Sequence, residues 1–396
     1  MRLNRKSLLG LAVAAVAVPA AIAVIPNAQA AESPALLPLT VTNNSGRGEA
    51  THLYVLGVSG DKLGYVNAGG TFTPWTGGAN PPAPAPDVSI DGPANGASTT
   101  ISVPKGISGR MYMSFGEKLD FKISQDGGLV QPAPWAAGDA NSDILFDWSE
   151  FTYNDSGIWL NSSQVDMFAV PHAVSVTGSD GQTAKTGELE AGGRNTVIDA
   201  MKDNESFSGL VQTRDDGTVL RVLSPGKGAD GGNFDPDYLA PYIDEAWAAY
   251  ANTDLTVQPF ADQPDKVFKG RTSGDVMTFT DSTGAQAATF TKPTTANVWG
   301  CDGNLGAPND LVVGPIARSL CAALQRTTLG TQKVEPSTDA STFYQNDLTN
   351  EYAKVIHEQM VDGKAYAFAF DDVANQESLV HSGDPTSIAI TLTPFN

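Results

Sequence analysis

The sequence of 396 residues predicts a mainly β protein that carries an inserted mixed α/β domain. From residue 39 to residue 121, short alternating runs are interrupted by Gly, Pro and Asn, a pattern typical of an all-β sandwich or barrel. Helical periodicity first appears after about residue 180 and fades near residue 350. We therefore expect residues 31–180 to form the first part of a β domain, residues 181–350 a mixed α/β domain, and residues 351–396 a return to the β domain.

Residues 1–30 have the composition of a secretory signal peptide. Three basic residues within the first six precede an apolar stretch at residues 8–25, and Ala28-Gln29-Ala30 is a small-residue cleavage site. The alternative is a membrane anchor, because the apolar run approaches the minimum spanning length, but two prolines and the cleavage site favour the signal peptide. We expect a secreted, extracellular protein.

The charge of the chain excludes several classes of partner. Lysine and arginine number 24 and acidic residues number 44, which gives a formal net charge of −20. Removing the three basic residues of residues 1–30 leaves 21 minus 44, or −23, on the mature chain. Such a chain repels nucleic acid and anionic membranes and suits neutral substrates such as glucans.

The histidines and cysteines indicate neither a metal site nor a cofactor. His52, His172, His357 and His381 are widely separated and show no metal-ligand spacing. The two cysteines, Cys301 and Cys321, are expected to form a disulfide in an oxidising compartment, which fastens the loop around Asp302 to the helix that carries Cys321.

The individual elements follow from periodicity and from the residues that interrupt it. Strands are expected at 39–42, 52–58, 98–103, 109–115, 265–271, 276–280, 287–291, 365–370 and 387–393. Helices are expected at 195–202, from the N-cap Asp235 and Pro236 to Tyr250, at 312–326, and from about Asn346 to Met360. The last two strands are expected to close the first β domain.

The run Gly226-Lys-Gly-Ala-Asp-Gly231 formally matches the glycine pattern of a dinucleotide-binding loop. Asp230 would oppose a phosphate, and the expected helix cap at Asp235 lies beyond the glycines. We therefore interpret the run as a surface loop. No Gly-x-Ser-x-Gly elbow occurs, so the sequence does not indicate a Ser/His/Asp hydrolase, although a triad assembled in space leaves no such signal.

Residues 146–171 predict a β-hairpin with two chemically different faces. If its strands pair around the turn at residues 154–157, so that Tyr153 faces Ile158, one face is apolar. That face carries Phe151 with Leu160 and Tyr153 with Ile158, and the opposite face carries Trp148, Glu150, Thr152, Asn154, Trp159 and Asn161. An aromatic plate among a carboxylate, a hydroxyl and amides is a surface that suits a sugar chain.

The hairpin motif also resembles a known family. The runs Ser149-Glu150-Phe-Thr152-x-Asn154, Trp159 and Gln164-Val-Asp166-Met-Phe are similar to the signature of glycoside hydrolase family 64, the laminaripentaose-producing β-1,3-glucanases. Further similarity lies in Pro315-Ile-Ala-Arg-Ser-Leu-Cys321-Ala-Ala-Leu and in Gly363-Lys-Ala-Tyr-Ala-Phe-Ala-Phe-Asp371-Asp372, the latter also similar to thaumatin-like barrels. The many disulfides of plant thaumatin-like proteins are absent, so their defence role is not carried over.

The resemblance implies a thaumatin-like β-barrel or sandwich domain and an α/β domain that flank a wide, open groove. It implies inverting cleavage of β-1,3-glucan such as laminarin, curdlan or fungal wall glucan, with release of laminaripentaose-type oligosaccharides. Carried over by motif, Glu150 is the general acid and Asp166 the general base, and Thr152, Asn154 and Trp159 contact the sugar. The resemblance leaves Asp371 and Asp372 open between a structural role and a groove-lining role.

The hairpin geometry sets a condition on this assignment. Asp166 lies five residues beyond Asn161, the partner of Glu150, and a straight strand would place it about 16 Å away on the wrong face. We therefore expect a bend at residues 161–163. To hold its proton near neutral pH, Glu150 is expected to lie beside Trp148 and the acidic residues Asp147 and Asp143.

Two other functions fit the same sequence features. One is a noncatalytic thaumatin-like glucan-binding protein, which release of reducing sugar from curdlan would exclude. The other is a thaumatin-like inhibitor or wall-interaction protein, which would tolerate loss of Glu150. We expect a monomer that binds β-1,3-glucan. The sequence leaves open the product length, the choice between endo and processive action, and the natural glucan.

Overall fold

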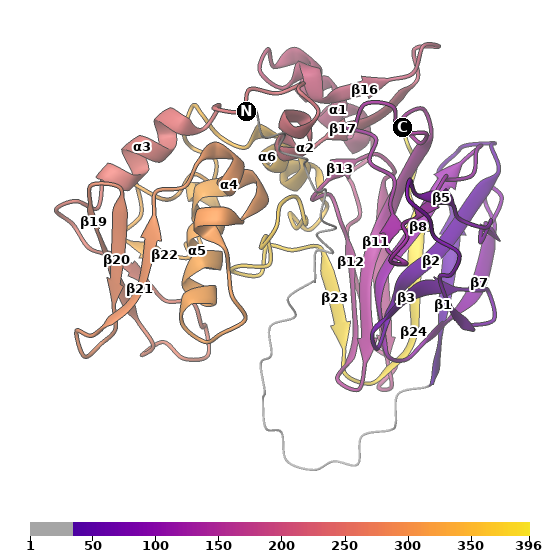
Figure 1. Cartoon of the computed structure of the whole chain (residues 1–396), viewed down its shortest axis with the longest axis horizontal. Coiled ribbons are helices and arrows are strands. Elements are labelled where there is room, and N and C mark those ends of the chain that lie inside the picture. The colour runs from indigo at the N-terminus through magenta and orange to yellow at the C-terminus, as the bar shows by residue number, and fades with distance from the viewer. Residues whose placement is uncertain (1–34) are drawn as a thin grey trace.

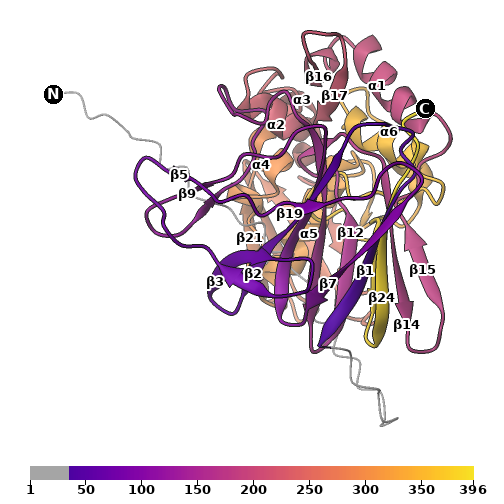
Figure 2. The same cartoon turned by 90° about the vertical axis from the view of Figure 1, so that its right-hand side faces the viewer.

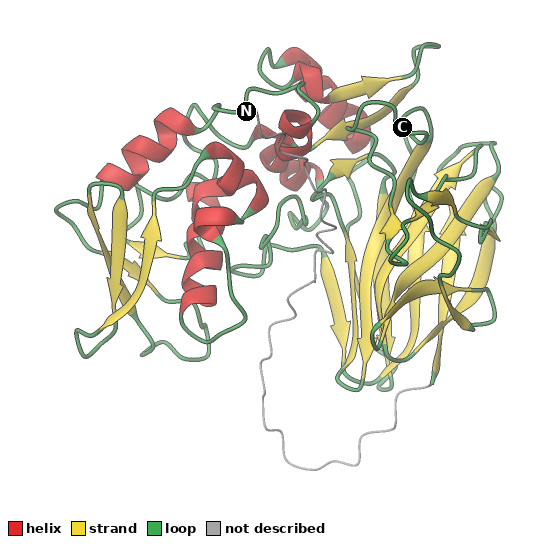
Figure 3. Ribbon diagram, in the orientation of Figure 1, coloured by secondary structure: helices red, strands yellow, loops and turns green. Residues whose placement is uncertain are grey.

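The structure is a computed structural model that describes residues 35–396 (Figure 1). The predicted signal peptide, residues 1–30, lies outside the described residues. A β-sandwich lies on one side of the molecule and an α/β part on the other. Coloured by secondary structure, the chain has helices beside the five-stranded sheet on the left and at the top centre of the view, whereas the sandwich consists of strands and loops (Figure 3). The chain is mainly β, as the alternating runs predicted.

Two sheets form the sandwich. The first has the order β15 (Thr183–Thr186), β14 (His172–Gly178), β24 (Pro385–Leu392), β1 (Leu36–Asn43) and β7 (Ser98–Pro104), side by side in Figure 2. The second has the order β23 (Leu379–Ser382), β12 (Gly157–Ser162), β11 (Leu145–Asn154), β8 (Ile107–Phe115), β2 (Thr51–Ser59), β3 (Lys62–Val66) and β4 (Phe72–Pro74), with β6 (Ile90–Asp91) on β2. Apolar residues that alternate along these strands fill the space between the sheets.

The C-terminal strand returns to the sandwich, as the sequence predicted for residues 387–393. β24 pairs in parallel with β1, and its other edge pairs antiparallel with β14. The first and last strands of the described chain are therefore neighbours in one sheet.

Two small sheets border the sandwich. One has the order β10 (Leu129–Val130), β9 (Lys122–Ile123) and β5 (Ala83–Pro84), and the other has the order β13 (Met167–Phe168), β17 (Val219–Leu223) and β16 (Val211–Thr213). The second of these joins the segment after the hairpin to the start of the α/β part.

The α/β part contains a five-stranded sheet and most of the helices. The sheet has the order β21 (Gln286–Thr291), β20 (Val276–Thr280), β19 (Phe268–Ser273), β18 (Leu255–Val257) and β22 (Val334–Glu335). The helices are α1 (Gly193–Asp203), α2 (Pro225–Asp230), α3 (Ala240–Ala248), α4 (Thr295–Gly300), α5 (Val313–Gln325) and α6 (Glu351–Gln359), with single 3₁₀ turns at Ser208–Leu210, Gly303–Leu305 and Ala340–Thr342. None of the helices within residues 35–396 has the length and apolar character needed to cross a membrane.

Two predicted helices begin later than expected. The helix expected from Asp235 begins at Ala240, and residues 236–239 form a turn in which Asp235 Oδ1 accepts the N–H of Asp237 at 2.9 Å. Pro241 lacks the N–H that a helix starting at residue 236 would need at that position. The helix expected from Asn346 begins at Glu351, because the Asn350 side chain caps it by accepting the N–H of Ala353 at 3.1 Å.

The strand expected at residues 365–370 is wrong. This segment is a loop in which the N–H of Ala365 donates to the carbonyl of Gln376, and those of the next two residues donate to side chains. Gln164 Oε1 accepts the N–H of Tyr366 at 3.1 Å, and Asp371 Oδ2 accepts that of Ala367 at 3.0 Å. Phe370 has a φ of 67°, which a strand does not allow. The alternation of Ala with aromatic residues therefore reflects side-chain packing without a β ladder.

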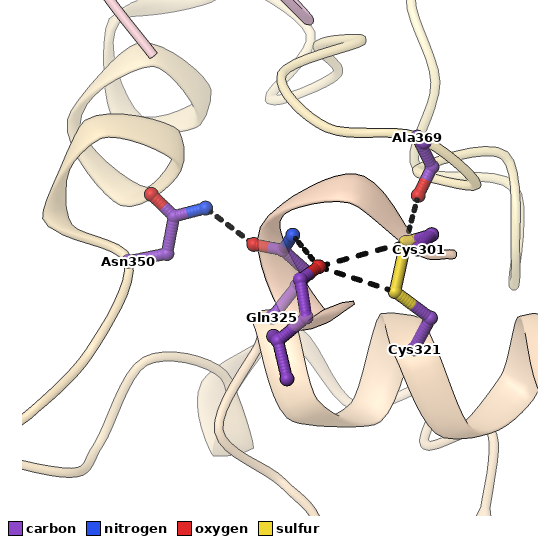
Figure 4. Close-up of a disulfide and its surroundings, with 6 residues drawn as sticks. Cys301, Cys321, Gln325, Asn350 and Ala369 are labelled. Carbon is purple, nitrogen blue, oxygen red and sulfur yellow. Dashed lines mark hydrogen bonds between the residues drawn. A yellow bond between two sulfur atoms is a disulfide. The ribbon is translucent and has the colours of Figure 1, made fainter. Parts of the chain in front are cut away.

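The predicted disulfide between Cys301 and Cys321 is present and joins the end of α4 to the middle of α5 (Figure 4). Beside it, Gln325 donates to the carbonyl of Val298 at 2.7 Å, and Asn350 donates to Gln325 Oε1 at 2.7 Å. The disulfide thus belongs to a polar cluster that connects α4, α5 and the beginning of α6.

Candidate active site

The hairpin has the predicted register. Strands β11 and β12 pair Glu150 with Asn161, Thr152 with Trp159 and Tyr153 with Ile158. Gly157 closes the turn with a φ of 110°, and a Cβ atom there would lie 2.0 Å from the carbonyl oxygen of Ser382. The apolar face is buried in the sandwich core, so Glu150 and Trp159 lie on the opposite face of the sheet.

The polar face of the hairpin is more constrained than the sequence suggests. Thr152 shares a hydrogen bond of 2.8 Å with Ser108, and Asn154 Oδ1 accepts the N–H of Ser156 at 2.8 Å in the turn. Trp148 lies on the expected face but is only 2% exposed, so it offers no surface to a sugar. Trp159 is partly exposed and stacks on His381, with ring centroids 4.2 Å apart and planes 18° apart.

The chain bends after β12 and places Asp166 near Glu150. β12 continues to Ser162, and the bend lies at residues 163–166, slightly later than predicted. Gln164 anchors the bend on both sides, because its N–H donates to the carbonyl of Tyr366 at 2.8 Å and its carbonyl accepts the hydroxyl of Tyr352 at 2.6 Å. Asp166 then lies directly before β13.

One guanidinium contacts both carboxylates. Arg110 Nη2 lies 3.0 Å from Glu150 Oε1 and 3.7 Å from Asp166 Oδ2. The sum of these two distances, 6.7 Å, is the largest separation that the two oxygen atoms can have. The structure therefore brings together the two residues that the sequence singled out, through a third residue that it did not.

Arg110 is held from several sides. It lies on β8 directly opposite Glu150, and its Nε donates to Glu150 Oε1 at 3.0 Å. Its Nη1 donates to Gln131 Oε1 at 3.2 Å, and its guanidinium carbon lies 4.6 Å from the centre of the Trp148 ring. Burial opposes its charge, but the neighbouring Tyr112, Glu150 and Asp166 outweigh burial and raise the pKa of Arg110. Sequence reasoning missed this residue because nothing local reveals the register between β8 and β11.

Lys227 is a second cation that the sequence analysis missed. Its Nζ lies 3.5 Å from Asp166 Oδ1 and 4.8 Å from the centre of the Trp135 ring. The glycine-rich run around it, expected to be a surface loop, is the short helix α2. A Cβ atom on Gly228 would lie 2.1 Å from the Leu210 side chain, and one on Gly231 would lie 2.7 Å from the Trp135 carbonyl. These glycines permit close packing, which explains the pattern without a phosphate.

Asp147 and Asp143, the acidic residues expected beside Glu150, make other contacts or face solvent. Asp147 Oδ2 accepts the N–H groups of Ala169 and Val170, both at 2.9 Å, and burial raises the pKa of Asp147 to about 7. Asp143 is exposed in the loop before β11. Among the described ion pairs, the group that contacts Glu150 is the cation Arg110.

Asp371 has a structural environment. It is fully buried, and its carboxylate accepts hydrogen bonds from Arg326 and His357, both at 2.9 Å. Burial raises the pKa of Asp371, but His357 and Arg326 outweigh burial and hold it below its usual range. Asp372 is only partly buried, and burial raises its pKa against the opposing charge of Arg318. Within the described residues, no group of three or more His, Cys, Asp and Glu side chains is arranged to hold a metal ion.

Comparison with known proteins identifies close relatives. A family model for β-1,3-glucanases, glycoside hydrolase family 64, matches residues 35–392. Two proteins named glucan endo-1,3-beta-glucosidase, from Arthrobacter sp. (strain YCWD3) and Cellulosimicrobium cellulans, are each 47% identical to the chain over 393 residues. Each alignment covers 99% of this chain and 71% of the relative.

Two solved structures of β-1,3-glucanases are also similar to this chain. The crystal structure of a laminaripentaose-producing β-1,3-glucanase in complex with laminaritetraose is 51% identical, with a TM-score of 0.88. The match covers 92% of this chain and all of that one. A β-1,3-glucanase domain from Clostridium beijerinckii shares the fold at 24% identity and a TM-score of 0.75, over 91% of this chain and 98% of that one.

Proposed function

The chain belongs to the β-1,3-glucanases of glycoside hydrolase family 64, and on that premise we propose how its residues cleave the glucan. The chain is a glucan endo-1,3-β-glucosidase. In the proposed mechanism Glu150 is the general acid and Asp166 the general base. The observation that carries this proposal is the contact of both carboxylates with the one guanidinium of Arg110.

The proposed reaction is a single displacement. Glu150 gives its proton to the glycosidic oxygen as the bond from this oxygen to the anomeric carbon breaks. Asp166 accepts a proton from a water molecule whose oxygen attacks the same carbon from the opposite face. Arg110 contacts Oε1 of Glu150 and thereby leaves Oε2 as the oxygen that carries the proton.

The separation of the carboxylates bears on the stereochemistry. Inverting glycosidases have carboxyl groups roughly 6.5–9.5 Å apart, with room for a water, whereas retaining enzymes have them about 5–5.5 Å apart. The upper limit of 6.7 Å between Glu150 Oε1 and Asp166 Oδ2 admits the lower end of the inverting range and also the retaining range. We propose inversion on the family motif, and the anomer of the product is the deciding measurement.

The remaining residues of the hairpin face are proposed to bind the glucan. The partly exposed ring of Trp159 offers an apolar face to a glucosyl unit. Thr152 and the amide nitrogen of Asn154 lie on the same face and are proposed to bind sugar hydroxyls. We further propose that a thaumatin-like β domain and the α/β domain flank an open groove.

Several wider properties of the enzyme are also proposals. The basic and apolar composition of residues 1–30 supports secretion, and we propose that the enzyme acts as an extracellular monomer. Its proposed substrates are laminarin, curdlan and fungal wall glucan, and its products laminaripentaose-type oligosaccharides, since a relative of 51% identity is described as laminaripentaose-producing.

The carboxylate roles are tested by Glu150→Gln and Asp166→Asn, with the exposed residues changed in Glu205→Gln and Asp61→Asn as matched controls. We expect each catalytic variant to keep its fold and lose at least about 10²-fold in the release of reducing sugar from curdlan, because an amide neither donates the proton nor accepts one from water. Activity within about tenfold of the parent would contradict the assignment. Binding of curdlan by the parent without release of reducing sugar would favour the noncatalytic alternative.

The same preparation tests the stereochemistry. Proton NMR of the earliest products is expected to show the α-anomer first, with the β-anomer growing only by mutarotation. Initial β-anomer, or a glycosyl ester trapped on either carboxylate, would mean a retaining mechanism and would replace the base role of Asp166 by that of a nucleophile.

A further inference from the structure

Lys227 contacts one of the two catalytic carboxylates and not the other. Its Nζ lies 3.5 Å from Asp166 Oδ1, and within residues 35–396 this is the one ion pair that the structure gives it. The side chains of Lys227 and Asp166 are only 29% and 17% exposed, so water screens their interaction less than it would at the surface. Arg110, by contrast, contacts Glu150 as well as Asp166.

The fold fixes Lys227 over Asp166 through the backbone. β13 and β17 pair Met167 with Leu223, so the residues next to this pair, Asp166 and Ser224, are also neighbours. The N–H of Ser224 donates to the carbonyl of Asp166 at 3.0 Å, and helix α2 begins at the following residue, Pro225. Lys227 lies in the first turn of this helix, which returns its side chain to Asp166.

Packing around α2 keeps the lysine in this place. The ammonium lies 4.8 Å from the centre of the Trp135 ring, a distance typical of a cation–π contact. Gly226 allows α2 to pack on Trp299, because an added Cβ there would lie 3.1 Å from the Trp299 Cβ. The position of Lys227 therefore depends on tertiary packing from two sides of the helix.

The other ionisable groups around Asp166 do not distinguish it from Glu150. Arg110 contacts the Oδ2 atom of Asp166, and the same guanidinium contacts Glu150. Tyr112 on β8 and Tyr352 on α6 also face Asp166, and burial raises the pKa of both hydroxyls, which therefore stay neutral at the working pH. Arg110 is shared between the two carboxylates, and Lys227 is the cation that distinguishes them.

We propose that Lys227 is the positioning residue of the general base: its ammonium pairs with Oδ1 of Asp166 and has no ion pair with Glu150 among the described residues, and this contact assigns the base role to Asp166 and the acid role to Glu150. The inference rests on the proposed function and extends it. Lys227 acts through Asp166, so its loss should change the pH range of the enzyme more than the maximal rate. When the lysine is removed, Arg110 is the one cation left in an ion pair with Asp166 among the described residues.

The experiment is the pH profile of kcat/KM on a soluble β-1,3-glucan for the parent, Lys227→Met, Lys227→Gln and Lys227→Arg. Lys62→Met serves as the control for the loss of one positive charge, because Lys62 is 64% exposed at the turn between β2 and β3. We expect both neutral variants to move the acid limb upward by about one pH unit and to leave the basic limb in place. Lys227→Arg and Lys62→Met should keep the parental acid limb.

Each outcome has a distinct meaning. An acid limb in Lys227→Gln that coincides with that of Lys62→Met overturns the proposal, and so does a shift confined to the basic limb, which would assign the lysine to Glu150. If Lys227→Met fails to fold, as its melting temperature would show, Lys227→Gln decides. Loss of activity in Glu150→Gln and Asp166→Asn together with a parental profile in Lys227→Gln overturns this inference alone, whereas an active Asp166→Asn overturns the proposed function.

Discussion

Trp159 presents two ring faces, and His381 occupies one of them. The rings stack with centroids 4.2 Å apart, and His381 is fixed in turn by a contact of 2.9 Å between its Nδ1 and the carbonyl oxygen of Ile158. Pairing of β12 with β23 places the two residues directly opposite each other. The proposed sugar platform is thus supported from behind by a neighbouring strand.

We expect Trp159→Ala to lower kcat/KM on long glucans by about three- to tenfold, which corresponds to roughly 1 kcal/mol of stacking. The melting temperature should change little, because the ring is only partly buried and belongs to neither apolar core cluster. Kinetics on curdlan and calorimetry of the variant test this. His381→Ala should have a smaller kinetic effect, since it removes the ring that stacks on Trp159 and leaves Trp159 itself in place. A large fall in the melting temperature of Trp159→Ala would show instead that the ring belongs to the core.

The residues of the site differ in how far the sequence could predict them. Glu150 and Asp166 lie within one motif, and the turn at residues 154–157 fixes the register that puts Glu150 on the polar face of the hairpin. Arg110 reaches them through the pairing of β8 with β11, two strands separated by about 30 residues of loops and small strands. Lys227 reaches Asp166 through β17 and α2. Pairings of this range depend on the assembled fold, and no local pattern encodes them.

At the scale of elements, periodicity predicted the strands and helices in which the spacing of apolar residues agrees with the period of the backbone structure. β20 was predicted with its observed bounds, and α5 within one residue at each end. The loop at residues 365–370 shows the limit of this reasoning. Its residues alternate as a strand would, but the side chains of Gln164 and Asp371 accept two of its N–H groups. Side-chain acceptors supplied from distant positions leave no trace in local periodicity.

The disulfide between Cys301 and Cys321 lies beside the loop at residues 365–370. It joins α4 to α5, and Cys301 Sγ also lies 3.0 Å from the carbonyl oxygen of Ala369 in the loop (Figure 4). Both cysteines are buried, at 5% and 0% exposure. The bridge closes a loop with a sequence separation of 20 residues.

We expect the double variant Cys301→Ser/Cys321→Ser to lose about 3 kcal/mol of the free energy of unfolding, because the unfolded chain regains the entropy of an open loop. Chemical denaturation of the parent and the variant measures this difference. Unfolding of the parent in the presence of a reductant should approach that of the variant. An unchanged midpoint would show that packing of α4 on α5 suffices without the bridge.

At the scale of the whole molecule, one apolar core joins the sandwich to the α/β part. It includes Trp148 on β11, Phe168 on β13, Leu223 on β17 and Ile316 on α5. Glu150 and Arg110 come from the sandwich, Asp166 from the connection, and Lys227 from the first helix after β17. A shared core therefore holds the two carboxylates and the two cations at fixed distances from one another.

Buried ionisable groups make the stability of this core dependent on pH. Burial raises the pKa of Asp147, Glu335 and Glu377 to about 7 in each case. A carboxyl whose folded pKa exceeds its unfolded value stabilises the fold fully below the unfolded pKa, and this stabilisation is lost as the pH rises toward 7. His172 opposes this trend, since burial lowers its pKa to about 4, so its contribution is present above pH 6.5 and is lost as the pH falls. The raised pKa values of Asp372 and His357 act in the same direction as those of the three carboxyls, so we expect greater stability near pH 5 than above pH 7.

Glu335 provides a direct test, because it is 1% exposed and its Oε1 has no hydrogen-bond partner. Glu335→Gln replaces the acid by a neutral side chain of the same shape, whose carbonyl can still accept the N–H of Ser337 that Oε2 accepts at 2.7 Å. We expect the parent to melt at a higher temperature at pH 5 than at pH 7.5. In the variant, the difference in the free energy of unfolding between these two pH values should shrink by roughly 2 kcal/mol, since no proton is lost from this site.

Glu205→Gln, an exposed change of the same type, should retain the parental difference. Denaturation at both pH values decides, and equal pH dependence in Glu335→Gln and the parent would show that Glu335 is already ionised in the folded protein at pH 5.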